Sequence, residues 1–314
     1  MKLFLTESPH FLQAFSKKGS IENSITIFDD SSIKWNINII NSMCKIDTVY
    51  LPEKFSETFS LVKETFPSIE VKPISENFKH FPESHLIFDN SQFPKMEQLT
   101  INLNSMVYQP KDTHNTIIDT IKYPWDYLSC TKNALDNHIT KTSISPTAKI
   151  AKTSIIYGPC IIEDNVTIDD FCKIQGPIYI GKDSFIGMGS LVRNCVLGKN
   201  TTIGFNCEIA KSYFAGSTEI AHHNVILDSV IGENVWFGGY SGTANVLLTK
   251  KNVKYQINDE LIDTGINHFG AVVGNGSSVG AAVIILPGRQ ILPNSVIQAG
   301  TIFGKKQLQS LVVQ

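Results

Sequence analysis

The sequence predicts two folds in one chain of 314 residues: an α/β domain over residues 1–140 and an all-β parallel β-helix over residues 141–314. Aliphatic residues recur at every sixth position through much of the second half, and glycine often follows them. The first half instead alternates short apolar runs with segments of helical spacing. Together these three observations set the fold class.

The six-residue spacing is the main evidence for the β-helix. It fits neither the 3.6-residue period of an α-helix nor the simple alternation of a flat sheet. Three such steps form one triangular coil of about eighteen residues, which buries its inner face only by stacking on the next coil. The evenly spaced residues are Ile150, Ile156, Ile162, Ile168, Ile174, Ile180, Ile186 and Val192, and later Val273, Val279, Ile285, Ile291, Ile297 and Phe303.

The repeat is interrupted in its middle part. Its spacing slips by one residue after Val192 and again before Ile231. Between the slips the expected inward residues are Leu197, Ile203, Ile209, Ala215 and Ala221. Residues 246–270 leave the repeat. Because residues 253–257 alternate apolar and polar before a turn at 258–259, this insertion is predicted to be a hairpin arm.

Composition argues against several classes of function. A net charge of −2 argues against nucleic acid or a membrane surface as partner. The sequence has no apolar run of transmembrane length, and residues 1–5 are too short for a signal peptide, so the cytoplasm is the expected location. No CxxC occurs, and four of the six cysteines stand two residues before an inward aliphatic. We therefore expect small corner residues rather than metal ligands or disulfides at Cys160, Cys172, Cys195 and Cys207.

Arginine is rare in this chain: Arg193 and Arg289 are the two examples among 27 basic residues. Codon usage in an AT-rich genome is one explanation, and a need for the planar guanidinium group, for example on a phosphate, is the other. Arg289 lies in a Pro-Gly-Arg corner, where we expect solvent exposure. Arg193 is the candidate for a ligand contact.

The first half is predicted to be a scaffold or assembly domain. The sequence contains no GxGxxG or GxxxxGKS/T loop, and Gly19 is the only glycine before residue 150. The close backbone packing that holds nucleotide phosphates is therefore missing. Residues 138–145 form the expected boundary. Apolar runs at 1–5, 24–28, 48–51, 69–71, 85–88 and 100–103 indicate strands, and residues 55–66 and 124–137 indicate helices.

Three segments resemble the two-domain sugar-1-phosphate nucleotidylyltransferase/acetyltransferases, especially their archaeal branch. They are residues 121–128, 219–245 and 263–271, and the similarity covers about residues 120–304 well and the first half only loosely. The resemblance implies a left-handed β-helix of hexapeptide repeats, joined to a reduced nucleotidyltransferase-like domain that has lost its own activity. It also implies acetyl-CoA as co-substrate and glucosamine- or galactosamine-1-phosphate as acceptor. The expected assembly is a homotrimer with sites between subunits.

The resemblance also implies the site residues. In that family a histidine on the β-helix takes a proton from the sugar amine, which then attacks the thioester of acetyl-CoA. The match places this general base at His222 and a second active-site residue at Asn245. Arg193 matches the arginine that binds the sugar phosphate, and Lys211 and Asn224 are further candidate substrate contacts. The coenzyme groove is expected at Gly239, Tyr240, Ala281 and Ala299.

Several residues depart from the family pattern. Val225 stands in place of a tyrosine, Trp236 in place of an asparagine and Ala210 in place of a lysine. The basic cluster that follows the arm in the family has become Ile-Asn-His at residues 266–268. The alternative function is therefore a catalytically inactive homologue that serves as a binding or assembly subunit.

Two other classes have weaker support. Nucleotidyl transfer by the first domain conflicts with its missing phosphate loop. A zinc-dependent carbonic anhydrase needs three histidines on stacked coils. His222 and His223 are expected on opposite sides of a strand, and His268 at the end of the arm. No metal is expected.

Overall fold

The computed structural model describes residues 2–6, 26–27, 30–31, 48–52, 62–64, 66–74, 85–89, 92–94, 118–120, 123–257 and 260–304. The chain forms two compact units, one of residues 1–11 and 30–122 and the other of residues 12–29 and 123–314. The predicted strand at 100–103, most of the predicted helix at 55–66 and the predicted arm turn lie outside the described residues. The domain boundary at residue 140 stays a prediction.

The first unit contains a four-stranded parallel sheet with the order β5-β4-β1-β6. Its strands are β1 (Lys2–Thr6), β4 (Thr48–Pro52), β5 (Glu70–Ile74) and β6 (His85–Asp89), at four of the predicted positions. Parallel neighbours need long crossover connections; that these contain the expected helices stays a prediction. Further short strands are β3 (Asp30–Ser31), β7 (Gln92–Pro94) and β8 (Ile118–Thr120) in this unit, and β2 (Thr26–Ile27) in the second.

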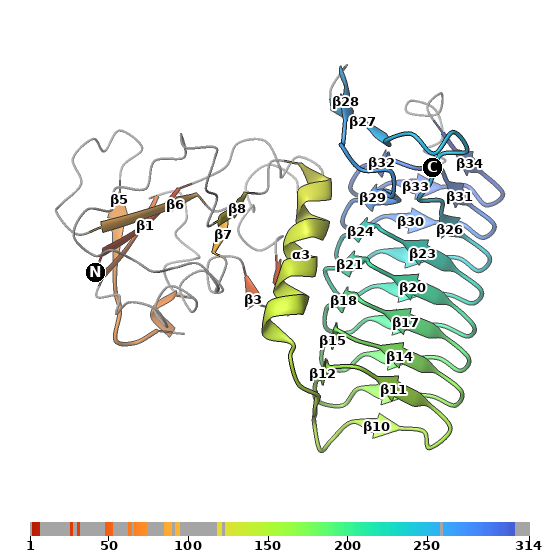
Figure 1. Cartoon of the computed structure of the whole chain (residues 1–314), viewed down its shortest axis with the longest axis horizontal. Coiled ribbons are helices and arrows are strands. Elements are labelled where there is room, and N and C mark those ends of the chain that lie inside the picture. The colour runs from red at the N-terminus through yellow and green to blue at the C-terminus, as the bar shows by residue number, and fades with distance from the viewer. Residues whose placement is uncertain are drawn as a thin grey trace. The chain divides into compact units, whose positions relative to one another are not determined.

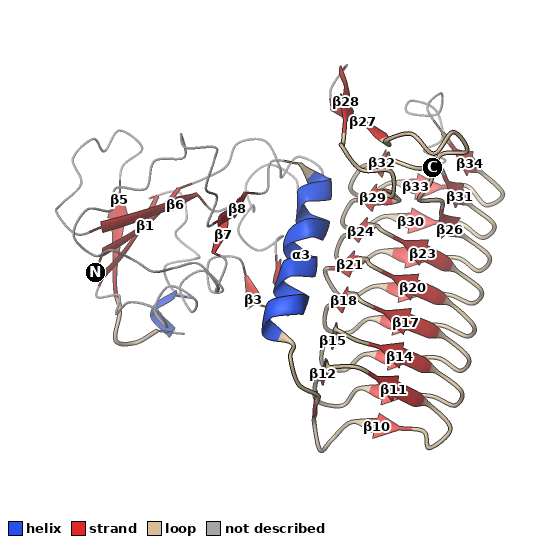
Figure 2. Ribbon diagram, in the orientation of Figure 1, coloured by secondary structure: helices blue, strands red, loops and turns tan. Residues whose placement is uncertain are grey.

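Residues 143–303 form a left-handed β-helix of three eight-stranded parallel sheets, one on each face of a triangular prism (Figures 1 and 2). One face lies under helix α3 (Pro124–His138), and we call it the helix-covered face. It contains β9 (Ser143–Ile144), β12 (Cys160–Ile162), β15 (Ile178–Ile180), β18 (Val196–Leu197), β21 (Tyr213–Phe214), β24 (Val230–Ile231), β29 (Ala271–Val273) and β32 (Arg289–Ile291). The Trp236 face contains β10 (Lys149–Ile150), β13 (Thr167–Ile168), β16 (Phe185–Ile186), β19 (Thr202–Ile203), β22 (Glu219–Ile220), β25 (Trp236–Phe237), β30 (Ser278–Val279) and β33 (Val296–Ile297). The Val225 face contains β11 (Ile155–Tyr157), β14 (Lys173–Gln175), β17 (Leu191–Arg193), β20 (Glu208–Ala210), β23 (Val225–Leu227), β26 (Gly242–Thr243), β31 (Ile284–Ile285) and β34 (Ile302–Phe303).

The inward side chains of successive coils stack into one continuous core, which confirms the predicted repeat. Ile180, Ile186 and Val192, one from each face of a single coil, have no exposed surface. Burial of each such side chain contributes about 1.5–3 kcal/mol. Gly204 shows how tightly the coils pack, because a Cβ there would lie 2.8 Å from the carbonyl carbon of Ala221 in the next coil.

The middle coils are one residue shorter than the others. Strand partners lie 18 residues apart in the early coils, as in the pair Cys160 and Ile178. They lie 17 apart in the middle, as in the pair Leu191 and Glu208. The spacing of 18 returns in the last coils. The shortened step always leads from the Val225 face to the helix-covered face, from Val192 to Leu197, from Ile209 to Phe214 and from Ile226 to Ile231.

This spacing corrects the predicted register. The prediction that Ala215 and Ala221 point inward is wrong, because Phe214 and Ile220 fill those positions and are fully buried. The prediction allowed one slip after Val192 and a second before Ile231, whereas the chain slips once in every middle coil. Phe214 and Ala215 are both apolar, so hydrophobicity alone did not distinguish them.

Helix α3 (Pro124–His138) packs on the helix-covered face of the second unit. Proline stands in its first turn, and the Tyr123 amide donates a 2.9 Å hydrogen bond to the Asp126 carboxylate. The Tyr127 ring meets the Tyr213 ring edge-on at 4.5 Å. This contact explains why the outward residues of this face are apolar and buried: Tyr179, Val196, Tyr213, Val230 and Val272.

The predicted hairpin arm is confirmed. Strands β27 (Lys254–Ile257) and β28 (Glu260–Asp263) pair antiparallel within the insertion between β26 and β29. At the base of the arm the rings of Trp125, Tyr255 and Phe269 lie 5.5–6.1 Å apart. This cluster attaches the arm to the start of α3.

Within the described part of the chain, every helix is too short or too polar to cross a bilayer.

The corrected register can be tested by truncating Phe214. We expect Phe214→Ala to lower the free energy of unfolding by about 3–5 kcal/mol, because a fully buried ring leaves a cavity that stacked coils cannot close. Phe205→Ala, at an exposed corner, is the matched control and should cost less than about 1 kcal/mol. Denaturant titration followed by circular dichroism measures both. Equal losses for the two variants would contradict the register.

Candidate functional site

The predicted site residues lie at two different corners of the prism. We call the turn between the Trp236 and Val225 faces the histidine corner; it contains residues 222–223, 239–240, 281–282 and 299–300 in four successive coils. The arginine corner is the turn between the Val225 and helix-covered faces, with residues 193–194, 210–211, 227–228 and 244–245. The histidine corner lies in tight turns, whereas at the arginine corner Arg193, Ala210 and Leu227 are the last residues of β17, β20 and β23.

His222 is exposed at the histidine corner and is held through its backbone and its ring. Its carbonyl accepts a hydrogen bond from the Tyr240 amide at 2.9 Å. Its Nδ1 accepts a longer bond of 3.3 Å from the Phe205 amide, one coil below. A neutral ring that accepts at Nδ1 carries its proton on Nε2. To take a proton at Nε2, the ring must first adopt the other neutral tautomer, with its proton on Nδ1. A half-turn of the ring away from the Phe205 amide makes this tautomer possible.

Beside His222, an aromatic stack runs up the same corner. The His223 ring lies 4.7 Å from the Tyr240 ring at an interplanar angle of 20°, and its other side meets the edge of Phe205 at 5.1 Å. Asn206 adds a 3.2 Å contact to Nδ1 of His223. His223 was not among the residues that the sequence singled out as a ligand contact.

Above these aromatic residues the corner carries only small side chains. Backbone hydrogen bonds of 2.8–2.9 Å place Gly239 above His222, followed by Ala281 and Ala299. The neighbouring column continues from Tyr240 to Ala282 and Gly300. The four residues predicted for the coenzyme groove, Gly239, Tyr240, Ala281 and Ala299, thus lie together with His222.

Asn224 lies behind this corner and not on it. Its side chain has no exposed surface, and its amide nitrogen donates to the carbonyls of Ala221 and His222 at 2.8 and 3.2 Å. Its Oδ1 accepts from the Ser241 amide at 2.9 Å. Asn224 therefore fixes the turn that presents His222, and the structure gives it no surface for a substrate.

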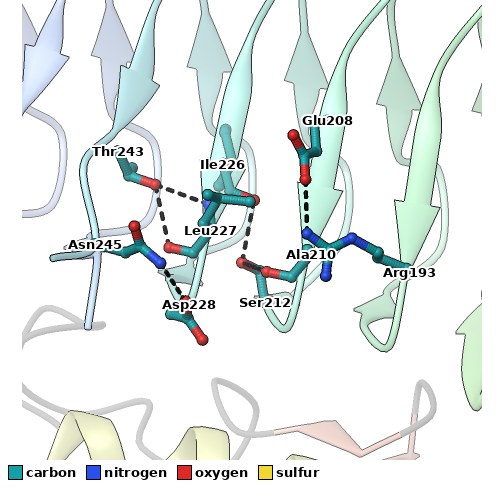
Figure 3. A network of polar contacts seen from close by, with 9 residues as sticks. All are labelled: Arg193, Glu208, Ala210, Ser212, Ile226, Leu227, Asp228, Thr243 and Asn245. Carbon is teal, nitrogen blue, oxygen red and sulfur yellow. Dashed lines mark hydrogen bonds and ion pairs between the residues drawn. The ribbon is translucent and has the colours of Figure 1, made fainter. Parts of the chain in front are cut away.

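At the arginine corner, Arg193 is paired with a carboxylate (Figure 3). Its Nη2 donates to Oε1 of Glu208 at 2.7 Å, and both side chains are about one-third exposed (30% and 36%). One coil further on, Lys211 is exposed in a left-handed turn with φ 49°. The corner thus carries two cations, one of them neutralised by Glu208.

Asn245 is held in one orientation by Asp228. Its amide nitrogen donates to Asp228 Oδ2 at 2.6 Å, which turns its carbonyl oxygen the other way (Figure 3). Sequence reasoning missed both Asp228 and Glu208. The 17-residue spacing of the middle coils was the available signal. Asp228 precedes Asn245 by 17 residues, and Glu208 pairs at the same spacing with Leu191, two residues before Arg193.

Within one chain the two corners stay apart. The strand that joins them, from residue 222 to 228, spans roughly 15–20 Å at about 3.3 Å per residue. His222 and the coenzyme-groove residues therefore share one edge of the Val225 face, while Arg193, Lys211 and Asn245 share the opposite edge.

The residues that depart from the family pattern flank these corners. Val225 is exposed on the Val225 face, and Trp236 is exposed on the Trp236 face between Glu219 and Ser278. Ala210 is buried in the column that follows Arg193. Val225 and Trp236 therefore change the surface beside the predicted site residues, whereas Ala210 is buried next to Arg193.

Arg289 corrects a further prediction. It was expected in solvent, but only 7% of it is exposed, and desolvation by this burial lowers its pKa. Alternation along β32 explains the result, since Ile291 and Arg289 point to the same side. Its Nε lacks a hydrogen-bond partner in the described structure.

The described residues contain no cluster of histidine, cysteine or carboxylate side chains that could hold a metal ion. The four predicted corner cysteines, Cys160, Cys172, Cys195 and Cys207, are free thiols and buried. Burial raises the pKa of each of them, most strongly at Cys195.

Comparison with known proteins agrees with this architecture. Residues 138–260 match the family model of the GMPPB C-terminal domain. The bifunctional protein GlmU of Methanococcus vannielii is 33% identical over 58% of this chain and 43% of its own length. The bifunctional sugar-1-phosphate nucleotidylyltransferase/acetyltransferase of Sulfurisphaera tokodaii is 33% identical over 58% and 45%. The uncharacterized acetyltransferase YaiX of Escherichia coli O6:K15:H31 is 31% identical over 51% of this chain and 72% of its own length. The chain spans less than half the length of the archaeal relatives it matches.

The inertness of Cys195 can be tested by alkylation. At pH 8 we expect iodoacetamide to label Cys195 at least about 10-fold more slowly in the folded protein than in urea, because burial keeps the thiol protonated and shielded. Peptide mass spectrometry follows each site separately. Equal rates in the folded and unfolded protein would show that this corner opens in solution.

Proposed function

Because this chain belongs to the left-handed β-helix family that includes the sugar-1-phosphate nucleotidylyltransferase/acetyltransferases, we propose that it transfers an acetyl group from acetyl-CoA to an amino-sugar 1-phosphate. The observation that carries the proposal is the histidine corner. There an exposed histidine stands at the foot of a column of glycine and alanine residues. Glucosamine- or galactosamine-1-phosphate is the expected acceptor.

Acetyl-CoA would lie along the small residues of the histidine corner. Gly239, Ala281 and Ala299 leave the backbone of three successive coils accessible, and a narrow chain of amide groups can follow such a surface. The thioester would then end beside His222. Binding by backbone and shape suits a co-substrate whose long arm carries few charges.

His222 would act as the general base. Once its ring has turned away from the Phe205 amide and its own proton has moved from Nε2 to Nδ1, Nε2 can take the proton of the sugar ammonium. The freed amine attacks the thioester carbonyl, and a tetrahedral oxyanion forms. Its collapse breaks the carbon–sulfur bond and releases the coenzyme thiolate, which takes up the proton from the imidazolium, while the nitrogen loses its second proton to water as the neutral amide forms. No covalent acyl-enzyme is needed.

The acceptor's phosphate would be held at the arginine corner of a neighbouring subunit. In one chain that corner is too far from His222, but flat-sided prisms packed about a three-fold axis bring the edge of one against the edge of the next. Arg193 and Lys211 would hold the phosphate, and Asn245, oriented by Asp228, would accept from or donate to the sugar. We therefore propose a homotrimer with sites between subunits, acting in the cytoplasm.

The first unit supplies no nucleotidyl transfer in this proposal, since the sequence lacks the phosphate-cradling loop that this chemistry requires.

A catalytically inactive binding or assembly subunit is the second candidate. The Arg193–Glu208 ion pair favours it, because a guanidinium that already has a carboxylate partner binds a phosphate less strongly. The His222 ring in its present tautomer favours it as well. Direct assay separates the two candidates.

Activity is tested by following free thiol after mixing the protein with acetyl-CoA and glucosamine- or galactosamine-1-phosphate. We expect thiol release with wild type, and a loss of at least about 100-fold in kcat with His222→Ala, since removal of a general base costs about that much or more. Phe205→Ala, which keeps His222, is the control for disturbance of the corner. Absence of release with every amino sugar, together with no acetyl-CoA binding by calorimetry, would leave the inactive subunit as the function.

Sharing of the site between subunits is tested by complementation. We expect His222→Ala and Asn245→Ala each to be inactive alone. When the two are co-expressed in equal amounts in one cell, we expect about a quarter of wild-type activity, because about a quarter of the interfaces in randomly mixed trimers combine an intact His222 with an intact Asn245. Mixed trimers can be isolated through two affinity tags. If they recover no activity, both residues belong to the site of a single subunit.

A further inference from the structure

Arg289 is a buried cation without a counter-charge. Only 7% of the residue is exposed, and its Nε is a buried polar atom that has no hydrogen-bond partner in the described structure. The ion pairs among the described residues do not include its guanidinium group either. Burial lowers the pKa of this group, and no neighbouring carboxylate raises it again. Charged side chains inside proteins are almost always paired, so Arg289 breaks a strong rule.

The register of the helix-covered face explains why Arg289 is buried. Strand pairing places it next to Ala271, on the same side of β32 as the core residue Ile291. Arginine therefore stands where the other coils place an uncharged residue. The equivalent positions of the earlier coils are occupied by Cys160, Ile178, Cys195, Ser212, Ser229 and Ala271, all of them buried.

The position of Arg289 in the last coil determines from which side a ligand can reach it. Strand β32 is the terminal strand of its sheet, so the sheet continues only on the side of Ala271. Strand β27 of the arm lies beside β32 (Figure 1). A Cβ on Gly288 would lie 2.8 Å from the Lys254 carbonyl oxygen, which shows how closely the base of the arm approaches. A ligand can thus reach the guanidinium group only from the end of the prism.

The charge of Arg289 selects the kind of ligand. A guanidinium group stays protonated in proteins, so burial cannot neutralise it as it can neutralise a lysine. Its planar fork binds carboxylate and phosphate oxygens through two parallel hydrogen bonds. A ligand with one negative charge leaves the buried pair neutral, whereas a doubly charged phosphate would leave a negative charge uncompensated. The matching group is therefore a carboxylate or a phosphate diester.

We propose that Arg289 anchors a binding site for a singly charged oxyanion, a carboxylate or a phosphate diester, in the last coil beside the base of the arm. The bound oxyanion accepts the unpaired hydrogen bonds of the guanidinium group and neutralises its buried charge. Four coil steps lead from β17, which ends at Arg193, to β31, the strand before Arg289, so the site lies about 20 Å along the prism from the proposed acceptor phosphate. It therefore goes beyond the proposed function and does not rest on it.

Because Arg193 and Arg289 are the two arginines of the chain, the site can be observed directly by NMR. With isotope-labelled arginine in the full-length protein, each residue gives one side-chain Nε–H signal, and Arg193→Met identifies that of Arg289. We expect sodium acetate and dimethyl phosphate, each titrated against sodium chloride at constant ionic strength, to shift the Arg289 signal to saturation. The Arg193 signal should stay in place, since Glu208 already pairs with that guanidinium group.

Thermal unfolding tests the missing counter-charge. We expect both oxyanions to raise the Tm of wild type by about 2–6 °C over chloride at the same ionic strength. Arg289→Met removes the charge and keeps an apolar side chain, so this rise should be lost. The Tm of Arg289→Met in chloride should equal or exceed that of wild type, because an unpaired buried charge has been removed. Arg193→Met, the same substitution at the other arginine, is the matched control and should keep the rise.

Several results would overturn the assignment. One is an Arg289 signal that neither oxyanion moves. A second is a Tm of Arg289→Met in chloride more than about 5 °C below wild type, which would show that the chain itself compensates the charge. A third is a stronger response to inorganic phosphate at pH 8, where phosphate is mostly a dianion. Loss of the rise in Arg193→Met would move the site to the arginine corner. An Arg289 signal that shifts with protein concentration in chloride alone would assign the position to a carboxylate of a second copy.

Discussion

The structure depends on one constraint: a coil of this β-helix cannot bury its own inner face. Each coil leaves three aliphatic side chains and a row of backbone amides and carbonyls without partners until another coil stacks on it. The parallel ladders of the three faces and the core of Ile180, Ile186 and their equivalents meet both needs at once. Because the interior admits almost only apolar side chains of fixed spacing, polar chemistry is confined to the outer faces and above all to the corners.

Much of the fold could be predicted, because the same constraint leaves its mark on the sequence. The six-residue spacing gave the β-helix, and the loss of that spacing gave the arm. The errors have a common physical origin. At Phe214 and Ala215 two neighbouring apolar residues could each fill the inward position, and only the coil above and below decides between them. Arg289 was assigned from its Pro-Gly context, whereas the alternation of its strand determines that it points away from solvent.

The site could be predicted only in part. Residue type and family resemblance indicated His222, Asn245 and Arg193, but they could not indicate that two corners of one chain hold them apart. They also gave no sign of Glu208 or Asp228, whose effects act from one coil to the next. Asn224 shows the opposite case, since a polar residue within the matched segment turned out to hold a turn together. A contact between coils depends on the length of the coil, and that length changes along this chain.

The missing residue of the middle coils has a consequence for how such a protein can vary. Each deletion falls at the arginine corner, and the strand pairs on all three faces stay aligned at the 17-residue spacing. A change of length at one edge of the prism is therefore absorbed within a single turn, and the turns at the other two edges keep their length. A β-helix of this kind behaves like a set of three independent rows of turns on one rigid frame. Evolution can rebuild the row that faces one ligand while the row that faces another stays as it was.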